Sequence, residues 1–229
     1  KETLDSPQRV EVMSTAAPDI DLDKLARLGD LLEEIDRGSL SIEDAYARID
    51  AIDEVPPPWG KFASMLGYVF TGLGLAPLLG AGWTDTLIAS LFSILVYGLV
   101  LVSARMGPLA MSWMPLTTAF IIGFLASMVK YWIPELNLIL VILSAVAIIL
   151  PGYSISLGAG ELVAQQVLSG VSNLMGGLIT LFKQIAGAVL GMGLAKLFFS
   201  MRSAAHEPPV DPMWMLLLFP LLLLGLSLA

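Results

Sequence analysis

The sequence predicts an all-α integral membrane protein, a polytopic bundle of five to six transmembrane helices preceded by a short soluble helical hairpin. Of its 229 residues 56% are hydrophobic and 14% are charged, whereas about a quarter are charged in soluble domains. Residues 1–58 hold 15 of the 20 acidic residues, and residues 59–229 hold five acids and six Lys or Arg. The acidity therefore belongs to a short head, and the long remainder is apolar.

Composition also narrows the chemistry. The chain has no cysteine and one histidine, His206, so it cannot build a thiolate metal site, a multi-histidine site or a thiol nucleophile. We expect no metal, no cofactor and no enzymatic activity. No basic stripe is present, so we expect no nucleic-acid partner.

The acidic soluble segment, residues 1–58, is expected to contain a helical hairpin over residues 22–54. Apolar residues at helical spacing mark its first helix, and these are Leu22, Leu25, Leu28, Leu32 and Ile35. Gly38 is expected to end that helix, and a second one follows over about 42–54. The prolines at 56–58 end the hairpin.

Two features suggest a piece of a longer protein. Residues 9–13 (RVEVM) could form one short strand, which is unstable without partners. The chain begins at Lys1 rather than Met and stops at Ala229 inside an apolar run. We expect further chain on both sides, and no signal peptide is visible in the head.

Residues 59–200 are expected to form a five-span bundle, and residues 201–229 a loop and the start of a further transmembrane helix. A spanning helix needs about 20 mainly apolar residues. The expected spans are 62–80, 85–103, 109–129, 136–150, 169–199 and 213–229. Tryptophans occur near their ends, as in membrane interfaces, at Trp59, Trp83, Trp113, Trp132 and Trp214.

Orientation is set by basic residues in the loops, but these are nearly balanced between the two sides. Lys61 and Arg105 favour a cytoplasmic head, whereas Lys130 falls on the other side. We expect the head in the cytoplasm and the bundle in the plasma membrane, because an acidic domain without a signal sequence is simplest to leave untranslocated.

The stretch 151–170 (PGYSISLGAGELVAQQVLSG) is polar and rich in glycine between two apolar spans. We interpret it as a broken-helix region, which membranes tolerate where protein or a water-filled cavity surrounds it. The alternative is an amphipathic turn at the interface. If it is recessed, its candidate substrate-binding or coupling residues are Ser154, Ser156, Glu161, Gln165 and Gln166.

Lys183 lies near the middle of the last long apolar run, where a lysine is costly and usually faces a cavity or a partner. Small residues share its face, and Gly187 and Gly191 form a GxxxG pair that allows close helix approach. Lys183 could therefore meet an anionic group or pair with Glu161. Alternatively a kink at Gly176-Gly177 would leave it near an interface.

The order of these features resembles the threonine/serine exporter (ThrE-type) membrane family. The matching residues are the hairpin LDKLARLGDLLEEIDRGSLSIEDAYARIDAI, the proline run, and a later pattern of Pro151-Gly152, Glu161-Leu162 and Ser169-Gly170. The resemblance covers about residues 20–229. Two positions depart from the family pattern: Gln166 stands where an acid is frequent, and Lys183 is unusual for its place.

The resemblance implies a secondary transporter that exports small polar amino acids, coupled to the proton-motive force. It also implies a second membrane half, in the same full-length chain or a partner subunit, with 213–229 as its opening span. Expected partners are the lipid bilayer and a small amino-acid or organic-acid substrate; a homo-oligomer is left open. The alternatives are an exporter of small dicarboxylates and a non-transporting interaction or accessory subunit.

Overall fold

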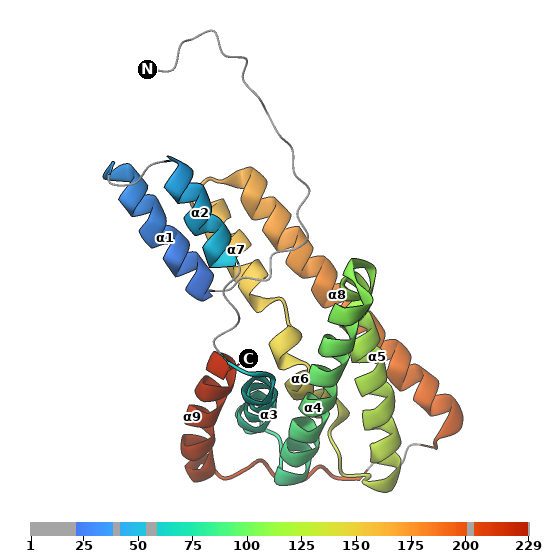
Figure 1. The fold of residues 1–229 in the computed structure, drawn as a ribbon. Helices are drawn as coiled ribbons and strands as arrows, with labels where there is room; N and C mark the ends of the chain where they lie inside the picture. Colours follow the sequence, from blue (N-terminus) through green and yellow to red (C-terminus); the bar gives the residue numbers. More distant parts are fainter. Residues whose placement is uncertain (1–21, 39–41, 54–58, 201–203, 229) are drawn as a thin grey trace. The chain divides into compact units, whose positions relative to one another are not determined.

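The computed structural model describes residues 22–38, 42–53, 59–200 and 204–228. The chain divides into two compact units, Lys1–Pro58 and Trp59–Ala229. Figure 1 traces the described helices along the chain. The strand expected at 9–13 and the prolines at 56–58 lie outside the described residues.

The first unit contains two helices, α1 (Leu22–Asp36) and α2 (Ile42–Asp53). Leu31 and Ala45 are its buried apolar side chains, so the two helices meet along this face. Gly38 follows α1 with φ of +70°, the left-handed conformation that ends helices and suits glycine.

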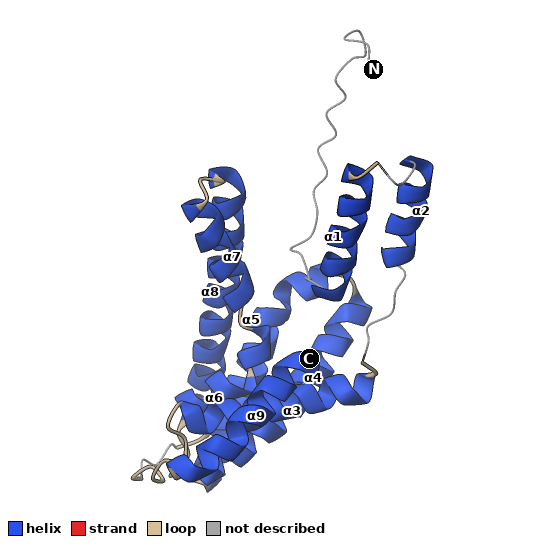
Figure 2. Cartoon of the chain, turned by 90° about the vertical axis from the view of Figure 1, so that its left-hand side faces the viewer, coloured by secondary structure: helices blue, strands red, loops and turns tan. Residues whose placement is uncertain are grey.

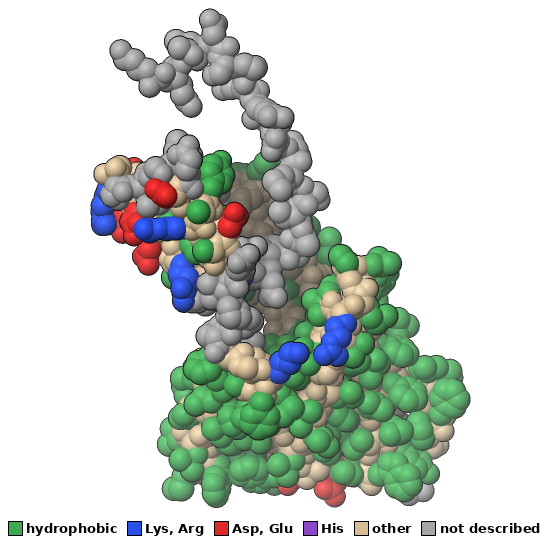
Figure 3. Space-filling view, in the orientation of Figure 1, with side chains coloured by type: hydrophobic (Ala, Val, Ile, Leu, Met, Phe, Trp, Pro, Cys, Tyr) green, Lys and Arg blue, Asp and Glu red, His purple; other side chains and the backbone are tan. Residues whose placement is uncertain are grey.

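The described part of the second unit consists of helices and loops, without a strand (Figure 2). In order they are α3 (Lys61–Leu78), α4 (Trp83–Met106), α5 (Pro108–Trp132), α6 (Leu138–Ala145), the short 3-10 helix η1 (Ala147–Ile149), α7 (Gly152–Val163), α8 (Val167–Phe198) and α9 (Pro212–Leu228). The predicted all-helical membrane fold is therefore confirmed. In Figure 3 hydrophobic side chains cover the visible face of this unit, and charged ones gather at its upper and lower edges.

Within the described residues three helices, α4, α5 and α8, are long and apolar enough to cross a membrane. A fourth crossing results if α6 and the following segment Ala147–Val163, bent by 62°, are taken together. The expected count of five to six is thus not confirmed. The 17 residues of α9 reach about 26 Å, and the 18 residues of α3 include Lys61 and three glycines, so both are marginal for a hydrocarbon core of about 30 Å.

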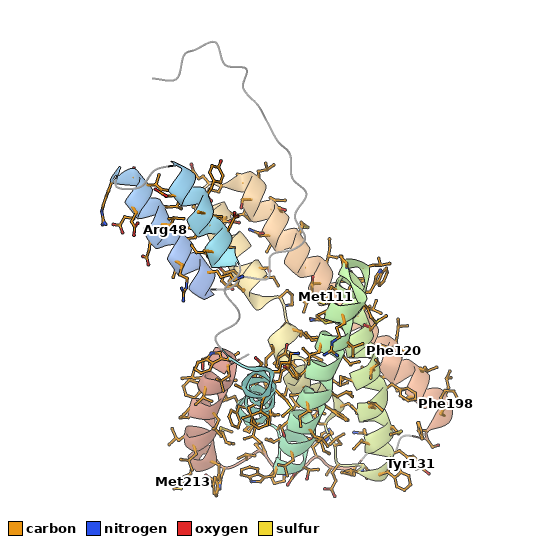
Figure 4. The ribbon with its side chains drawn as sticks, in the orientation of Figure 1. Arg48, Met111, Phe120, Tyr131, Phe198 and Met213 are labelled. Carbon is orange, nitrogen blue, oxygen red and sulfur yellow. The ribbon has the colours of Figure 1, made fainter. Side chains whose placement is uncertain are left out.

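α5 and α8 are joined by the glycine pair that the sequence singled out. A Cβ on Gly187 would collide with the carbonyl oxygen of Leu116, and one on Gly191 with that of Phe120. Figure 4 shows Phe120 on α5 beside α8. The predicted close approach of the GxxxG pair is confirmed, since only a hydrogen atom fits between these backbones.

The core of the unit lies among α3, α4, α5 and α6. Its fully buried apolar side chains include Val96, Ile122, Leu136 and Val141. α9 packs on α3, where a Cβ on Gly74 would lie 2.6 Å from the Leu222 side chain. The bundle is therefore closed by small-residue contacts on two sides.

The interruptions of the helical backbone near 151–170 fall at the two ends of α7. Residues 152–163 form one continuous helix between them, because glycine lowers helix propensity without forcing a break. The chain reverses only over Ala164–Gln166, and the sharp bend precedes α7, between Ala145 and Gly152. Pro151 explains that position, since the residue before a proline is driven out of the helical conformation.

Candidate functional site

Glu161 on α7 is held by two side chains of α8. Its Oε1 accepts a hydrogen bond from Ser169 Oγ at 2.6 Å, and its Oε2 accepts one from Asn173 Nδ2 at 2.7 Å. Ser169 and Asn173 are four residues apart and so lie on one face of α8. The Glu161 group, defined by these three residues, links α7 to α8, which pack antiparallel.

The turn between α7 and α8 places Gln165 and Gln166. Gln165 has φ of +65°, the one left-handed non-glycine residue among the described positions. Its N–H donates to Leu162 O at 3.1 Å, and the Gln166 N–H donates to Glu161 O at 2.9 Å. This is the Schellman pattern that ends a helix and satisfies its last carbonyls. Both glutamine side chains are exposed.

Ser154 and Ser156 lie in the first half of α7. Ser154 is half-buried beside α8, where a Cβ on Gly177 would meet its Cβ at 3.5 Å. Ser156 is exposed. The structure therefore does not gather the two serines with Glu161, since Ser156 and Glu161 are more than one helical turn apart.

Lys183 lies within α8, which is continuous from Val167 to Phe198 without a break at Gly176-Gly177. Its Nζ donates to the backbone oxygen of Ser112 at 2.8 Å and lies 5.6 Å from the centre of the Trp113 ring. Cations are attracted to the face of an aromatic ring at this distance. Lys183 is thus half-buried against the first turns of α5.

Lys183 and Glu161 do not form an ion pair. Lys183 follows Asn173, a partner of Glu161, by ten residues of α8, which is about 15 Å along the helix axis. In the described ranges neither side chain contacts an opposite charge, and the hydrogen-bond partners of both are neutral groups. The sequence-predicted residues therefore fall into two separate polar places on one helix.

Two functional candidates were missed. Gln184, beside Lys183, is 3% exposed and donates from Nε2 to the backbone oxygen of Ile149 at 2.6 Å. Asp85 is 2% exposed, and its Oδ1 accepts the N–H of Asn137 at 2.8 Å. Two sequence signals could have identified them. Gln184 is an amide side chain within an apolar run, and Asp85 is an acidic residue at the start of an apolar run.

Metal binding has no support in this arrangement. In the part of the chain that the structure describes, no three His, Asp or Glu side chains gather closely enough to hold an ion. The polar groups that the arrangement offers are carboxylate, amide, hydroxyl and one lysine.

Comparison with known proteins identifies the family. Residues 3–195 match the family model described as "Putative threonine/serine exporter" (ThrE). A "Probable threonine/serine exporter" of Mycobacterium tuberculosis (strain ATCC 25618 / H37Rv) is 29% identical over 91 residues. Those residues are 40% of this chain and 17% of that protein, so the match spans a small part of the relative. No solved structure matches the chain.

The family match includes the α1–α2 hairpin, the core helices and nearly all of α8. It covers well over half of the chain, and the apolar helices agree with it. The chain is therefore a membrane protein, and it belongs to the threonine/serine exporter family.

Proposed function

We propose that the protein is a secondary transporter that exports small polar amino acids of the threonine and serine type, driven by the proton-motive force. The observation that carries this proposal is the family match over residues 3–195. Helices α4, α5 and α8, each able to cross a membrane, support it. We place the bundle in the plasma membrane and the head in the cytoplasm, with Lys61 and Arg105 as the inside charges.

The polar residues of α7 and α8 have the chemistry that such a substrate needs. A zwitterion carries an ammonium, to which Glu161 offers an opposite charge, and a carboxylate, to which Lys183 offers one. The two residues lie about 15 Å apart along the axis of α8, so each can meet one of these groups but they cannot hold one amino acid together. Among the described residues Glu161 is bound to Ser169 and Asn173, and Lys183 to the Ser112 carbonyl and the Trp113 ring. Because these partners are neutral, each charge can meet an oppositely charged substrate group without first breaking an ion pair.

Ser154, Ser156, Gln165 and Gln166 are proposed as secondary contacts on the same hairpin. Ser156 and both glutamines are exposed at the α7–α8 surface, so their hydroxyl and amide groups are free to exchange water for solute. Hydrogen bonds of this kind provide selectivity among small polar molecules more than affinity.

The decisive experiment is efflux of labelled L-threonine from loaded proteoliposomes or loaded cells that express the protein. We expect Glu161→Gln to lower the efflux rate at least tenfold. Glu135→Gln is the matched control, since Glu135 is an exposed acid of the same unit. Equal efflux by both variants would remove the role of Glu161, and efflux that ignores a protonophore would remove proton coupling.

We also propose that a second membrane half packs against α8. Exposed apolar side chains recur along α8 at alternating spacings of three and four residues: Leu168, Val171, Met175, Leu178, Phe182, Ile185 and Val189. That alternation is the pattern of a seam between helices. A photo-cross-linking residue placed at Met175 should cross-link to another helix in membranes, and labelling by lipid-phase reagents alone would contradict the seam.

A further inference from the structure

The bend before α7 is an interruption of helical backbone inside the membrane unit. α6 ends at Ala145, η1 covers Ala147–Ile149, and α7 starts at Gly152. Residues 147–151 are all half-buried, whereas Gly152 and Tyr153 are exposed. A break of this kind leaves carbonyl groups at the end of one helix and N–H groups at the start of the next. The bend therefore presents hydrogen-bond acceptors and hydrogen-bond donors within a few residues of each other.

Side chains from two other helices bind the carbonyl side of the bend. Ser93 Oγ of α4 lies 3.5 Å from Ala145 O, and Gln184 Nε2 of α8 donates to Ile149 O at 2.6 Å. Both side chains are at least 97% buried. Gln184 thus extends from α8 into the bend, two helical turns beyond the place where Gly177 packs on Ile155.

Of the two polar atoms of the Gln184 side-chain amide, only the nitrogen has a hydrogen-bond partner among the described residues. Its Oε1 is buried and has no hydrogen-bond partner among the described residues. The two amide atoms share one carbon, so Oε1 lies at the bend together with the bonded Nε2. Leaving a buried acceptor unpaired costs free energy, and such atoms call for a partner. That partner must be a hydrogen-bond donor.

The N-terminus of α7 supplies the opposite polarity. Its N-cap residue is Pro151, which offers no side-chain acceptor to the first turn. The first backbone bond of the helix runs from the Ile155 N–H to Pro151 O, so the N–H groups of Tyr153 and Ser154 precede the intrahelical bonds. Free N–H groups and the helix dipole together favour a carboxylate at this position.

We infer that the bend between α6 and α7 is the binding site for a zwitterionic α-amino acid. The substrate carboxylate binds the N–H groups of the first turn of α7, and its ammonium donates to Gln184 Oε1. This inference rests on the proposed function, because it places the amino acid of that transport reaction. In this inference the substrate is recognised by Gln184 and by the backbone of α7, and Glu161 and Lys183 are not part of the binding site.

The chain contains no cysteine, so a single introduced thiol can report on the site. Tyr153→Cys places the thiol at the exposed start of α7, and Val163→Cys places one at its other end, where Val163 is 86% exposed. We expect saturating L-threonine to slow N-ethylmaleimide labelling of Tyr153→Cys at least fivefold. Labelling of Val163→Cys should change less than twofold.

The same assay tests the two substrate groups. 3-Hydroxybutanoate, which lacks the ammonium of threonine and has no hydrogen-bond donor in its place, should give no protection of Tyr153→Cys. Protection by this analogue equal to that by threonine would overturn the role of Gln184 Oε1. Protection by sodium ions alone would overturn the amino-acid site in favour of a cation.

Substitution of Gln184 provides the second arm. We expect Gln184→Leu to raise the Kd for L-threonine at least tenfold, and Thr180→Val, on the same helix, to leave it within twofold. Thr180 bonds only to its own helix at Gly176 O. Wild-type Kd in a Gln184→Leu protein with wild-type elution and tryptophan fluorescence would overturn the site. If Gln184→Leu does not fold, the Tyr153→Cys arm decides.

The two proposals fail differently. If the wild-type protein neither exports threonine nor shows protection, the proposed function falls, and the site falls with it. If the wild-type protein exports threonine while Tyr153→Cys is labelled at one rate with and without it, only the site at the bend is refuted.

Discussion

The carboxylate of Glu207 accepts a hydrogen bond from the backbone N–H of Thr84, with 2.9 Å between Oε2 and N. Thr84 is the second residue of α4, and Glu207 lies in the connection from α8 to α9, 123 residues later. Three residues on, the Val210 N–H donates to Ala81 O at 3.1 Å. The connection is therefore bound by one hydrogen bond to the first turn of α4 and by another to the loop between α3 and α4.

Glu207→Ala should lower the free energy of unfolding by about 1 kcal/mol, because Gly82 at the N-cap of α4 has no side-chain acceptor of its own. Thermal unfolding in detergent measures the change. Glu135→Ala is the control, since the exposed Glu135 contributes its backbone oxygen to His206 rather than its carboxylate. A loss of the same size in the control would show that net charge, not the Thr84 contact, is responsible.

Gly191→Ala should destabilise the protein by about 1 to 3 kcal/mol, since its Cβ would overlap the backbone of α5 at Phe120 and Phe124. Gly193→Ala, on the same helix, should instead stabilise it by about 0.5 to 1 kcal/mol, because nothing lies within 4 Å and alanine favours helix. Denaturant titration of both variants measures the difference. Effects of the same sign would contradict this account of the α5–α8 contact.

Gln165→Gly should raise the free energy of unfolding by about 1 kcal/mol, because Gln165 occupies a left-handed conformation that costs other residues about this much. Gln166→Gly, where φ is −81°, should lower it instead. Hydrogen exchange of the α7 and α8 amides would report the change locally. Stabilisation by both substitutions would argue against a defined turn.

Asn173→Ala should weaken the α7–α8 hairpin by about 1 to 2 kcal/mol, since hydrogen bonds to a charged carboxylate are among the stronger ones. A double-mutant cycle with Glu161→Gln should give a coupling energy of about 1 kcal/mol for the contact. Thr180→Ala, whose hydroxyl bonds within its own helix, provides the uncoupled reference. A coupling near zero would show that Glu161 and Asn173 act independently.

Helix positions were largely predictable because apolar spacing is a local property. The leucine stripe marks α1, Gly38 marks its end, and Trp83 and Trp132 begin and end α4 and α5 as interfacial residues do. The GxxxG pair also predicted close packing, although the sequence did not name α5 as its partner. Local sequence patterns thus predicted the helices, but they did not predict which helices pack against each other.

The candidate site was predictable only in part. Serine and glycine content suggested an open backbone at 151–170, and the structure interrupts the helical backbone before Gly152 and over Ala164–Gln166, with a continuous helix between these two places. Gln184 is a site candidate because it donates a hydrogen bond to Ile149, 35 residues earlier. Asp85 is one because it accepts a hydrogen bond from Asn137, 52 residues later. Such contacts depend on which helices become neighbours, and spacing along the chain does not record that.

The contact of Gly187 and Gly191 with the α5 backbone has a mechanical consequence. With no side chain between the two helices, α5 and α8 cannot slip past each other by a turn without first separating. In any rearrangement of the bundle the two helices must therefore move together. The bent segment between Ala145 and Gly152 is tied to this pair by the hydrogen bond from Gln184 to Ile149 O, so it must either move with α8 or break that bond first.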